Sequence, residues 1–432
     1  MAVNLNQVVG IFALLAWACG NSPTDAQIVQ ADVTEVSHTA VGEVLPEGPT
    51  NAEITVGAER WSRVLAEVSG KRVGCVVNHT SIASGQHLVD RMLDSGVDVR
   101  RVFAPEHGFR GEASDGERVT NQVDARTGLP IVSLYGKTKK PTAEMLADID
   151  VLVFDIQDVG TRFYTYISTL YYLVEACTAT NTELLVLDRP NPNGHYIDGP
   201  MLAPGYESFI GIARMPVVHG LTVGELARYF DHLITPEHNA KLRPRVVPCD
   251  HYTVGQEYVL PIKPSPNLPT QSSIYLYPTL CFFEGTVASI GRGTDFPFEV
   301  VGHPDFPDMG FTFTPEARPG AAYAKLKGQT CNGIDLRGQG THQADSINWP
   351  LIDYVAGAIE AAPFVDRTKH FDLVAGGPTV RAALNAGTLG RFSETYQEEL
   401  SAWRGEVCPW LLYERVNQAE AWSDCTEFMV AP

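Results

Sequence analysis

Five short apolar runs between residues 72 and 187 constrain the fold of this chain more than any other feature. Almost every position in them is apolar, which is typical of parallel strands covered on both faces. The runs are Arg72–Asn78, Val99–Ala104, Leu129–Leu134, Val151–Ile156 and Glu183–Leu187.

Stretches with helical patterning separate these runs. They are Gln86–Ser95, Thr142–Asp148 and Ile167–Thr180, and Gly224–Leu233 follows with Thr222 and Glu225 placed as a capping box. Strands that alternate with helices predict an α/β fold with a mostly parallel sheet and helices on both faces.

The composition and pattern of the sequence change at about residue 239. Arg243–Val247 predicts a strand, Leu260–Leu280 is rich in proline and serine, and Glu284–Glu299 is rich in glycine and charge. The pattern predicts a first domain at 55–238 and a smaller α+β domain at 239–432.

A polar cluster follows each apolar run of the first domain. The clusters are Asn78-His79-Thr80, Glu106-His107, Tyr135-Gly136-Lys137, Asp155-Ile156-Gln157-Asp158 and Asp188-Arg189-Pro190-Asn191, and His219 follows the shorter run Met215–Val218. In an open parallel sheet the carboxyl ends of the strands share one edge, where ligands bind. The sequence therefore predicts a polar site at that edge.

Composition and motifs exclude several functions. A formal net charge of -19 argues against general binding to nucleic acid or to anionic membranes, although local arginines can still bind an anionic substrate. The sequence contains no GxSxG, SxxK, HExxH or Walker A motif, and no GxGxxG follows the first strand. Serine hydrolases, zinc peptidases, nucleotide hydrolases and NAD enzymes are therefore disfavoured.

The N-terminus has the pattern of an export signal. Val8–Ala18 is apolar and ends in small residues before Cys19, which predicts a signal segment at 1–19 with a lipid on Cys19. Residues 20–54 are predicted to be a linker, and the protein is predicted to lie in the periplasm or at the cell surface. A wrongly assigned start codon is the alternative.

Eight cysteines are present, and seven remain if Cys19 carries a lipid. Cys408 and Cys425 are the favoured disulfide in an oxidising compartment. No pair has CxxC spacing, so a zinc site is not expected.

Several polar residues could be catalytic or structural. Glu106 between Phe103 and Phe109 could have the raised pKa of a general acid, or it could belong to a turn. Asp155 could cap a helix or bind a sugar, and Arg189 could bind an anion or simply lie in a rigid turn. The segment from Glu284 through Arg292 to Glu299 could bind a ligand or be a solvated loop.

Seven blocks, in one order over roughly residues 55–430, resemble the NamZ-type exo-β-N-acetylmuramidases, a bacterial family long carried as a domain of unknown function. They are APEHGFRGEASDGE, TGLPIVSLYGKTKKPTAEML, DIDVLVFDIQDVGTRFYTYISTL, VLDRPNPNG, HGLTVGELA, PSPNLPT and CFFEGTVASIGRGTDFPFE. The resemblance implies a Rossmann-like domain, a smaller C-terminal domain and an active site between them. It also implies release of N-acetylmuramic acid from non-reducing ends of peptidoglycan fragments, without metal or other cofactor.

Carried onto these blocks, the resemblance makes Glu106 the first choice for the acid. The candidates for the second carboxylate are Asp155, Asp158 and Glu284, and those for a cation that binds the lactyl carboxylate are Arg110, Arg162, Arg189 and Arg292. His79, His107 and His219 could bind hydroxyls or tune the acid, and the further substrate-binding candidates are Gln157, Tyr164, Asp188, Asn191 and Glu299. Ala288 and Ile290 stand where the resemblance implies more polar residues.

The sequence is compatible with more than one mechanism. Carboxyl groups about 5 Å apart would indicate a retaining reaction, and about 6.5–9.5 Å an inverting one. The acetamido group of the substrate could also act as the nucleophile. The rival functions are a non-enzymatic lipoprotein that binds cell-wall sugars, and an esterase or deacetylase acting on the same fragments.

Overall fold

The computed structural model describes residues 54–106, 108–110, 122–238, 243–339, 344–361 and 363–416, together with Trp422 and Cys425. These residues belong to one compact unit. The predicted signal segment, almost all of the predicted linker and His107 lie outside the described residues. No helix in the described ranges is both long enough and apolar enough to cross a membrane.

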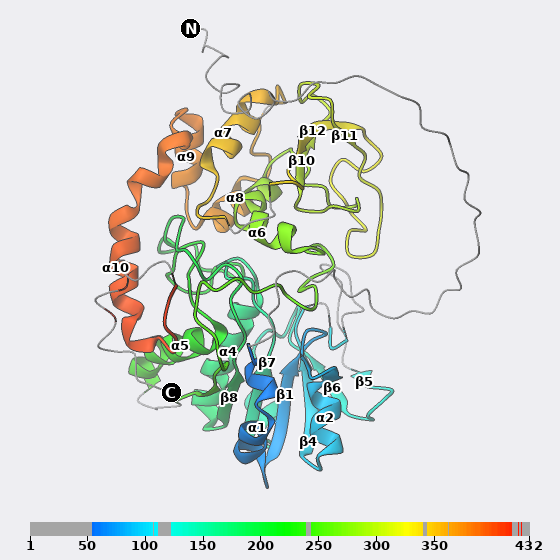
Figure 1. Cartoon of the computed structure of the whole chain (residues 1–432), viewed down its shortest axis with the longest axis vertical. Helices are drawn as coiled ribbons and strands as arrows, with labels where there is room; N and C mark the ends of the chain where they lie inside the picture. Colours follow the sequence, from blue (N-terminus) through cyan, green and yellow to red (C-terminus); the bar gives the residue numbers. More distant parts are fainter. Residues whose placement is uncertain are drawn as a thin grey trace, which may run out of the picture. The chain divides into compact units, whose positions relative to one another are not determined.

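A seven-stranded sheet in the order β5-β6-β4-β1-β7-β8-β9 forms the framework of the first part of the chain (Figure 1). The strands are β1 (Arg72–Val77), β4 (Asp98–Ala104), β5 (Gln122–Val123), β6 (Pro130–Ser133), β7 (Val151–Asp155), β8 (Glu183–Leu187) and β9 (Arg245–Val247). All are parallel except β5, which pairs antiparallel with β6. Numbered by appearance, the parallel strands lie in the order 3-2-1-4-5-6, which is the Rossmann arrangement. The predicted Rossmann-like sheet is therefore confirmed.

The central strand β1 is packed tightly between its neighbours. Its residues from Val73 to Val77 are buried. A Cβ atom at Gly74 would lie 2.7 Å from Ile149 Cδ1 and 2.9 Å from Leu152 Cδ1. A larger residue would force these two side chains to move, so Gly74 allows them to cover the sheet closely.

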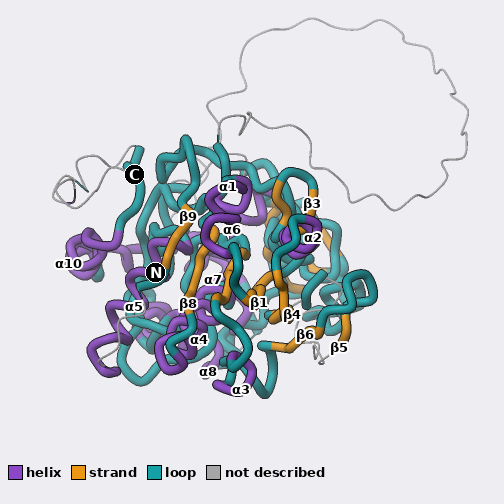
Figure 2. Tube along the Cα trace, turned by 90° about the horizontal axis from the view of Figure 1, so that it is seen from below, coloured by secondary structure: helices purple, strands orange, loops and turns teal. Residues whose placement is uncertain are grey.

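Helices lie on both sides of the sheet. Figure 2 shows α1 (Trp61–Val68) and α2 (Leu88–Asp94) on one side, with α3 (Ala143–Leu146) and α4 (Tyr166–Thr180) on the other. The helix predicted from Gln86 begins two residues later, because Gln86 and His87 form β3 and pair with β2 (Ile82–Ala83).

The predicted capping box at the start of α5 (Val223–His238) is confirmed. The Thr222 N–H donates to Glu225 Oε2 at 3.0 Å, and the Glu225 N–H donates to Thr222 Oγ1 at 3.3 Å. α5 packs beside α4 and leads the chain back to the sheet edge.

The C-terminal region is smaller and mixed, as predicted. Three antiparallel strands lie in the order β10-β12-β11. The strands are β10 (Val300–His303), β11 (Thr312–Phe313) and β12 (Cys331–Asp335). The helices are α6 (Gln271–Leu280), α7 (Trp349–Ala358), α8 (Thr368–Ala375), α9 (Thr379–Asn385) and α10 (Gln397–Val407). Short 3-10 segments are η4 (Cys281–Gly285), η5 (Leu389–Thr395) and η6 (Cys408–Trp410), and a further one, η3 (Gly57–Glu59), precedes α1. The large sheet continues past residue 239 through β9, beyond the boundary that the sequence texture suggested.

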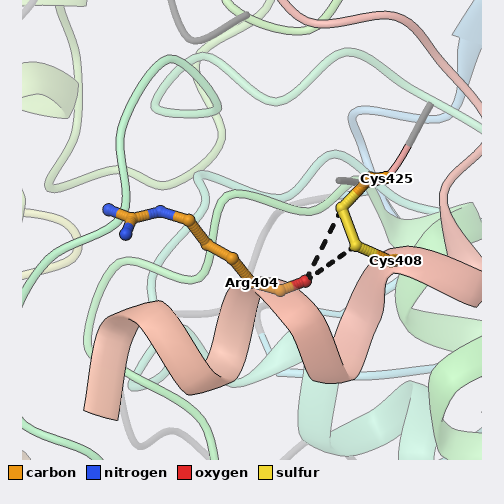
Figure 3. Close-up of a disulfide and its surroundings, with 3 residues drawn as sticks. All are labelled: Arg404, Cys408 and Cys425. Carbon is orange, nitrogen blue, oxygen red and sulfur yellow. Dashed lines mark hydrogen bonds between the residues drawn. A yellow bond between two sulfur atoms is a disulfide. The ribbon is translucent and has the colours of Figure 1, made fainter. Parts of the chain in front are cut away.

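A disulfide closes the end of α10. Cys408 and Cys425 are bonded, as predicted, and the other described cysteines are free and buried. Figure 3 shows both sulfur atoms beside the carbonyl oxygen of Arg404, which lies 3.2 Å from Cys408 Sγ.

Candidate active site

A cavity of about 600 Å³ lies between the carboxyl edge of the large sheet and the C-terminal region. From the sheet side it is lined by Glu106, after β4, and by Tyr135, after β6. From the C-terminal side it is lined by Glu284 of η4 and by the loop that follows, including Ala288 and Ile290. This loop therefore contributes an apolar surface where the family resemblance implies polar contacts.

Glu106 is fixed by the start of α4. Its Oε2 accepts a hydrogen bond from Thr165 Oγ1 at 3.0 Å, and its backbone carbonyl accepts one from the Tyr166 hydroxyl at 3.4 Å. The side chain is half-buried and faces the cavity. A positioned carboxyl group of this kind can donate a proton to a leaving-group oxygen.

Glu284 is held as a carboxylate. Burial raises its pKa, but the guanidinium of Arg292 and His370 outweigh burial and bring the pKa down to about 2. Arg292 Nε donates to Glu284 Oε1 at 2.9 Å, Arg292 Nη2 donates to the same oxygen, and His370 Nε2 lies 3.9 Å from Oε2. At neutral pH this group is ionised, so it can stabilise positive charge or attack a carbon but cannot donate a proton.

Lys325 supports the turn that carries Glu284. Its ammonium donates to the carbonyl oxygens of Phe283 at 3.1 Å and Glu284 at 3.4 Å, and also to that of Thr286. Burial lowers its pKa to about 8. The lysine therefore fixes the backbone of η4 with a positive charge close to the carboxylate.

Aromatic rings form much of the cavity wall. The ring centroids of Tyr164 and Tyr277 are 6.0 Å apart, and those of Tyr277 and Phe298 are 4.9 Å apart. The Arg292 guanidinium lies 5.1 Å from the centroid of the Phe298 ring. Tyr323 also lines the cavity and is 98% exposed. Aromatic faces beside carboxyl groups suit the apolar faces and polar edges of a sugar.

Asp155 and Arg189 form a buried ion pair that does not line the cavity. Arg189 Nε lies 2.6 Å from Asp155 Oδ1, and Arg189 Nη2 lies 3.0 Å from Oδ2. Asp155 ends β7 opposite Val77 of β1, which is the point where the strand order reverses. At this edge of the sheet the two charges therefore bind each other.

The polar residues after Asp155 are also engaged by the protein. Asp158 accepts from the Gly160 N–H at 2.7 Å, and its Oδ2 lies 3.6 Å from His219 Nε2. Gln157 Nε2 donates to the carbonyl oxygens of Asp158 and Pro190, both at 2.8 Å. None of these three predicted residues is among those that line the cavity.

The polar residues that follow β8 are also hydrogen-bonded to other protein groups. Asp188 accepts from Thr222 Oγ1 at 2.8 Å and from the Tyr413 hydroxyl at 2.6 Å. Burial raises the pKa of Asp188 to about 6 despite these bonds. Asn191 Nδ2 donates to the Leu221 carbonyl at 2.9 Å. These contacts join the sheet edge to the residues just before α5 and to the segment after η6, outside the cavity lining.

Besides Arg189, two more of the predicted arginines have protein partners away from the cavity. Arg110 forms a two-point contact with Asp124, at 3.1 and 2.9 Å. Arg162 donates to the carbonyl oxygens of Met215 at 2.8 Å and Val374 at 3.1 Å, and burial lowers its pKa to about 9. Arg162 thus connects the first part of the chain to α8.

The remaining predicted residues lie elsewhere. His79 Nε2 is 2.9 Å from the carbonyl oxygen of Lys263, and Glu299 Oε1 accepts from Thr270 Oγ1 at 2.9 Å. His107 lies outside the described residues. Of the sixteen predicted site residues, the described cavity lining contains Glu106, Tyr164, Glu284 and Arg292.

Several lining residues were not predicted from the sequence. They are Thr165, Asn267, Tyr323, Lys325, Arg367 and His370, among others. Glu106 was identified because it follows a predicted strand. Most of these other residues do not follow one, so that signal could not identify them. Thr165 lies in the same family-like sequence block as Arg162 and Tyr164. Its position beside these two predicted residues could have identified it.

No group of three or more histidine, cysteine, aspartate or glutamate side chains within the described ranges is arranged to hold a metal ion.

A Rossmann-like sheet with two differently held carboxyl groups and aromatic walls around one cavity defines a site of the glycoside hydrolase kind. Family models described as "Exo-beta-N-acetylmuramidase NamZ, N-terminal" and "Exo-beta-N-acetylmuramidase NamZ, C-terminal" match residues 73–272 and 275–413. The chain belongs to this family of exo-β-N-acetylmuramidases.

Individual relatives agree with the family models. The peptidoglycan beta-N-acetylmuramidase NamZ of Bacillus subtilis (strain 168) is 36% identical over 378 residues, covering 80% of this chain and 88% of that protein. Two crystal structures of DUF1343 family proteins from Bacteroides fragilis NCTC 9343 each cover 84% of this chain and 100% of their own. Their TM-scores are 0.76 and 0.73, at 36% and 29% identity.

Proposed function

We propose that this chain is an exo-acting glycoside hydrolase that releases N-acetylmuramic acid from the non-reducing ends of peptidoglycan fragments. The observation that carries the proposal is the pair Glu106 and Glu284, which share one cavity in a chain of the exo-β-N-acetylmuramidase family. Cleavage of a glycosidic bond needs one carboxyl group that donates a proton and a second negative centre opposite the developing positive charge.

The two glutamates divide these roles by their contacts. Glu106 has a neutral hydroxyl as its partner at 3.0 Å, so a carboxylic acid at this position keeps its hydrogen-bond partner. Glu284 is kept ionised by Arg292 and has a pKa of about 2. We assign proton donation to Glu106, and we assign stabilisation of the oxocarbenium-like transition state, or nucleophilic attack, to Glu284.

The test uses two chromogenic substrates, an aryl β-N-acetylmuramide and the matching β-N-acetylglucosaminide. We expect colour release from the muramide, and we expect Glu106→Gln to slow cleavage of an unmodified muramic-acid disaccharide, whose leaving group needs a proton, by about 10²–10⁴-fold. Arg337→Gln is a control, because Arg337 pairs with Asp335 and does not line the cavity. Binding of the muramide without release by the wild-type protein would favour the sugar-binding alternative and contradict the proposal.

We also propose export, with a lipid on Cys19 as the membrane anchor. The apolar run before Cys19 and the Cys408–Cys425 disulfide support a location outside the reducing cytosol. Fatty-acid labelling of the wild-type chain and of Cys19→Ser tests the anchor. Equal labelling of both proteins, or no labelling of either, would contradict it.

A further inference from the structure

Apart from His370, which lies 3.9 Å from Glu284, three basic side chains line the described part of the cavity: Arg292, Lys325 and Arg367. Two of these three already have partners. Arg292 is bound to Glu284 through Nε and Nη2. Lys325 donates to three carbonyl oxygens of the η4 turn, which is as many hydrogen bonds as an ammonium group can donate.

Arg367 is the third of these cations. It is exposed, it lines the cavity, and no residue in the described ranges forms an ion pair or a side-chain hydrogen bond with its guanidinium. The cavity carboxylates do not neutralise it, because Glu106 is bound to Thr165 and Glu284 to Arg292. In a chain with a net charge of -19, an arginine without an acidic partner on a cavity wall points to an anionic group of the ligand.

The position of Arg367 is fixed relative to the second carboxylate. Arg367 is the residue before α8, and its backbone N–H donates to the Gly285 carbonyl at 3.2 Å. A Cβ atom at Gly285 would lie 2.6 Å from Phe371 Cβ, so η4 and α8 are in close contact. A sugar held at Glu284 therefore has Arg367 on an adjoining, firmly packed element.

We propose that Arg367 binds the lactyl carboxylate of the terminal sugar and makes the cavity select an acidic amino sugar over N-acetylglucosamine. The inference rests on the proposed function. On a terminal N-acetylmuramic acid without a peptide, the lactyl carboxylate is the one anionic group. A guanidinium can contact both of its oxygens at once. The arginines favoured by the sequence, Arg110, Arg162 and Arg189, are bound to other protein groups.

The test measures the binding of N-acetylmuramic acid and N-acetylglucosamine by calorimetry to the wild-type protein, Arg367→Gln and Lys369→Gln. We expect Arg367→Gln to weaken binding of N-acetylmuramic acid by roughly 10- to 100-fold, as expected for loss of a charge-assisted hydrogen bond, and to leave N-acetylglucosamine unchanged. Lys369→Gln is the matched control, because Lys369 is an exposed cation two residues away that does not line this cavity. It should bind both sugars as the wild type does.

A kinetic measurement separates specificity from a structural role. With the chromogenic muramide, Arg367→Gln should raise KM by a similar factor and leave kcat within a few-fold. Equal losses for both sugars, or wild-type binding of N-acetylmuramic acid by Arg367→Gln, would overturn the inference. Wild-type protein that prefers N-acetylmuramic acid in calorimetry but cleaves no substrate would overturn the proposed function and leave this inference standing.

Discussion

Glu106 and Glu284 line the same cavity but have different hydrogen-bond partners, and we infer their chemical roles from those partners. Thr165 offers Glu106 a hydroxyl, whereas Arg292 offers Glu284 a full positive charge. A guanidinium favours the ionised form of the carboxyl group beside it, whereas a threonine hydroxyl can donate to a carboxylate or accept from a carboxylic acid. Experiments can distinguish the roles of the two glutamates.

The first prediction compares Glu106→Gln and Glu284→Gln on two leaving groups. A nitrophenyl group leaves without protonation, so Glu106→Gln should retain much more activity on the nitrophenyl muramide than on a natural disaccharide. Glu284→Gln should lose activity on both. Steady-state rates on the two substrates measure the effect, and a thermal melt of each variant controls for folding. Equal sensitivity of Glu106→Gln to both substrates would argue against its role as the acid.

The second prediction concerns pH. With a pKa of about 2, Glu284 is ionised at every pH above about 3, so it should not produce an acid limb in the wild-type profile of kcat/KM. Arg292→Gln removes the cation and leaves the burial that raises the pKa. The Glu284 pKa should therefore rise, and activity should fall off as the pH drops through the new value.

Profiles of kcat/KM against pH for the wild type and Arg292→Gln check this shift, with Arg337→Gln as a control for loss of an exposed charge. An identical acid limb in all three proteins would contradict the assignment of the pKa shift to Arg292.

At the scale of elements, the strand ends are stabilised by buried polar contacts. Asp155 at the end of β7 and Arg189 after β8 are almost completely buried, and they satisfy each other across neighbouring strands. Removing one member leaves the other charge buried without a partner, which is more costly than removing both.

The third prediction follows from this pair. Arg189→Met should lower the free energy of unfolding by about 3–5 kcal/mol, and the double variant Asp155→Asn with Arg189→Met should lose less. Urea unfolding of the wild type and the variants measures both values. A double variant that is as unstable as the sum of the single variants would show that the two side chains are not coupled.

The fourth prediction concerns the disulfide after α10. It closes a loop with a sequence separation of 17, and removal of such a link costs up to about 3 kcal/mol. Cys408→Ser with Cys425→Ser should therefore lower Tm but leave kcat unchanged at 25 °C, because neither residue lines the cavity. The free cysteines are buried, so Cys177→Ala serves as a control for loss of a thiol. Loss of kcat in the folded double variant would contradict this account.

At the scale of the whole molecule, the fold was more predictable than the site. The apolar runs locate five strands of the large sheet, because strands buried on both faces must be apolar throughout. The runs do not identify β5, whose two residues are both exposed, or assign β9 to the same sheet.

The site was predicted only in part, for a physical reason. Residue order places polar groups at one edge of the sheet, but it does not say which of them bind one another. Asp155, Arg189 and Asp188 form buried contacts with other protein groups. Lys325 and Arg367 line the cavity although they lie far from these residues in the sequence. The resemblance to the exo-β-N-acetylmuramidases predicted the family and the enzyme class, and both are confirmed.

Cleavage of a muramic-acid glycoside by this cavity is best tested by product analysis with an unmodified disaccharide, N-acetylmuramic acid linked β-1,4 to N-acetylglucosamine. We predict that mass spectrometry will detect equal amounts of both free sugars with the wild-type protein and with Arg337→Gln. Glu106→Gln and Glu284→Gln, although folded, should release each sugar at least about 100-fold more slowly. An intact disaccharide with the wild type, or full activity in both glutamate variants, would contradict the claim that this cavity cleaves muramic-acid glycosides.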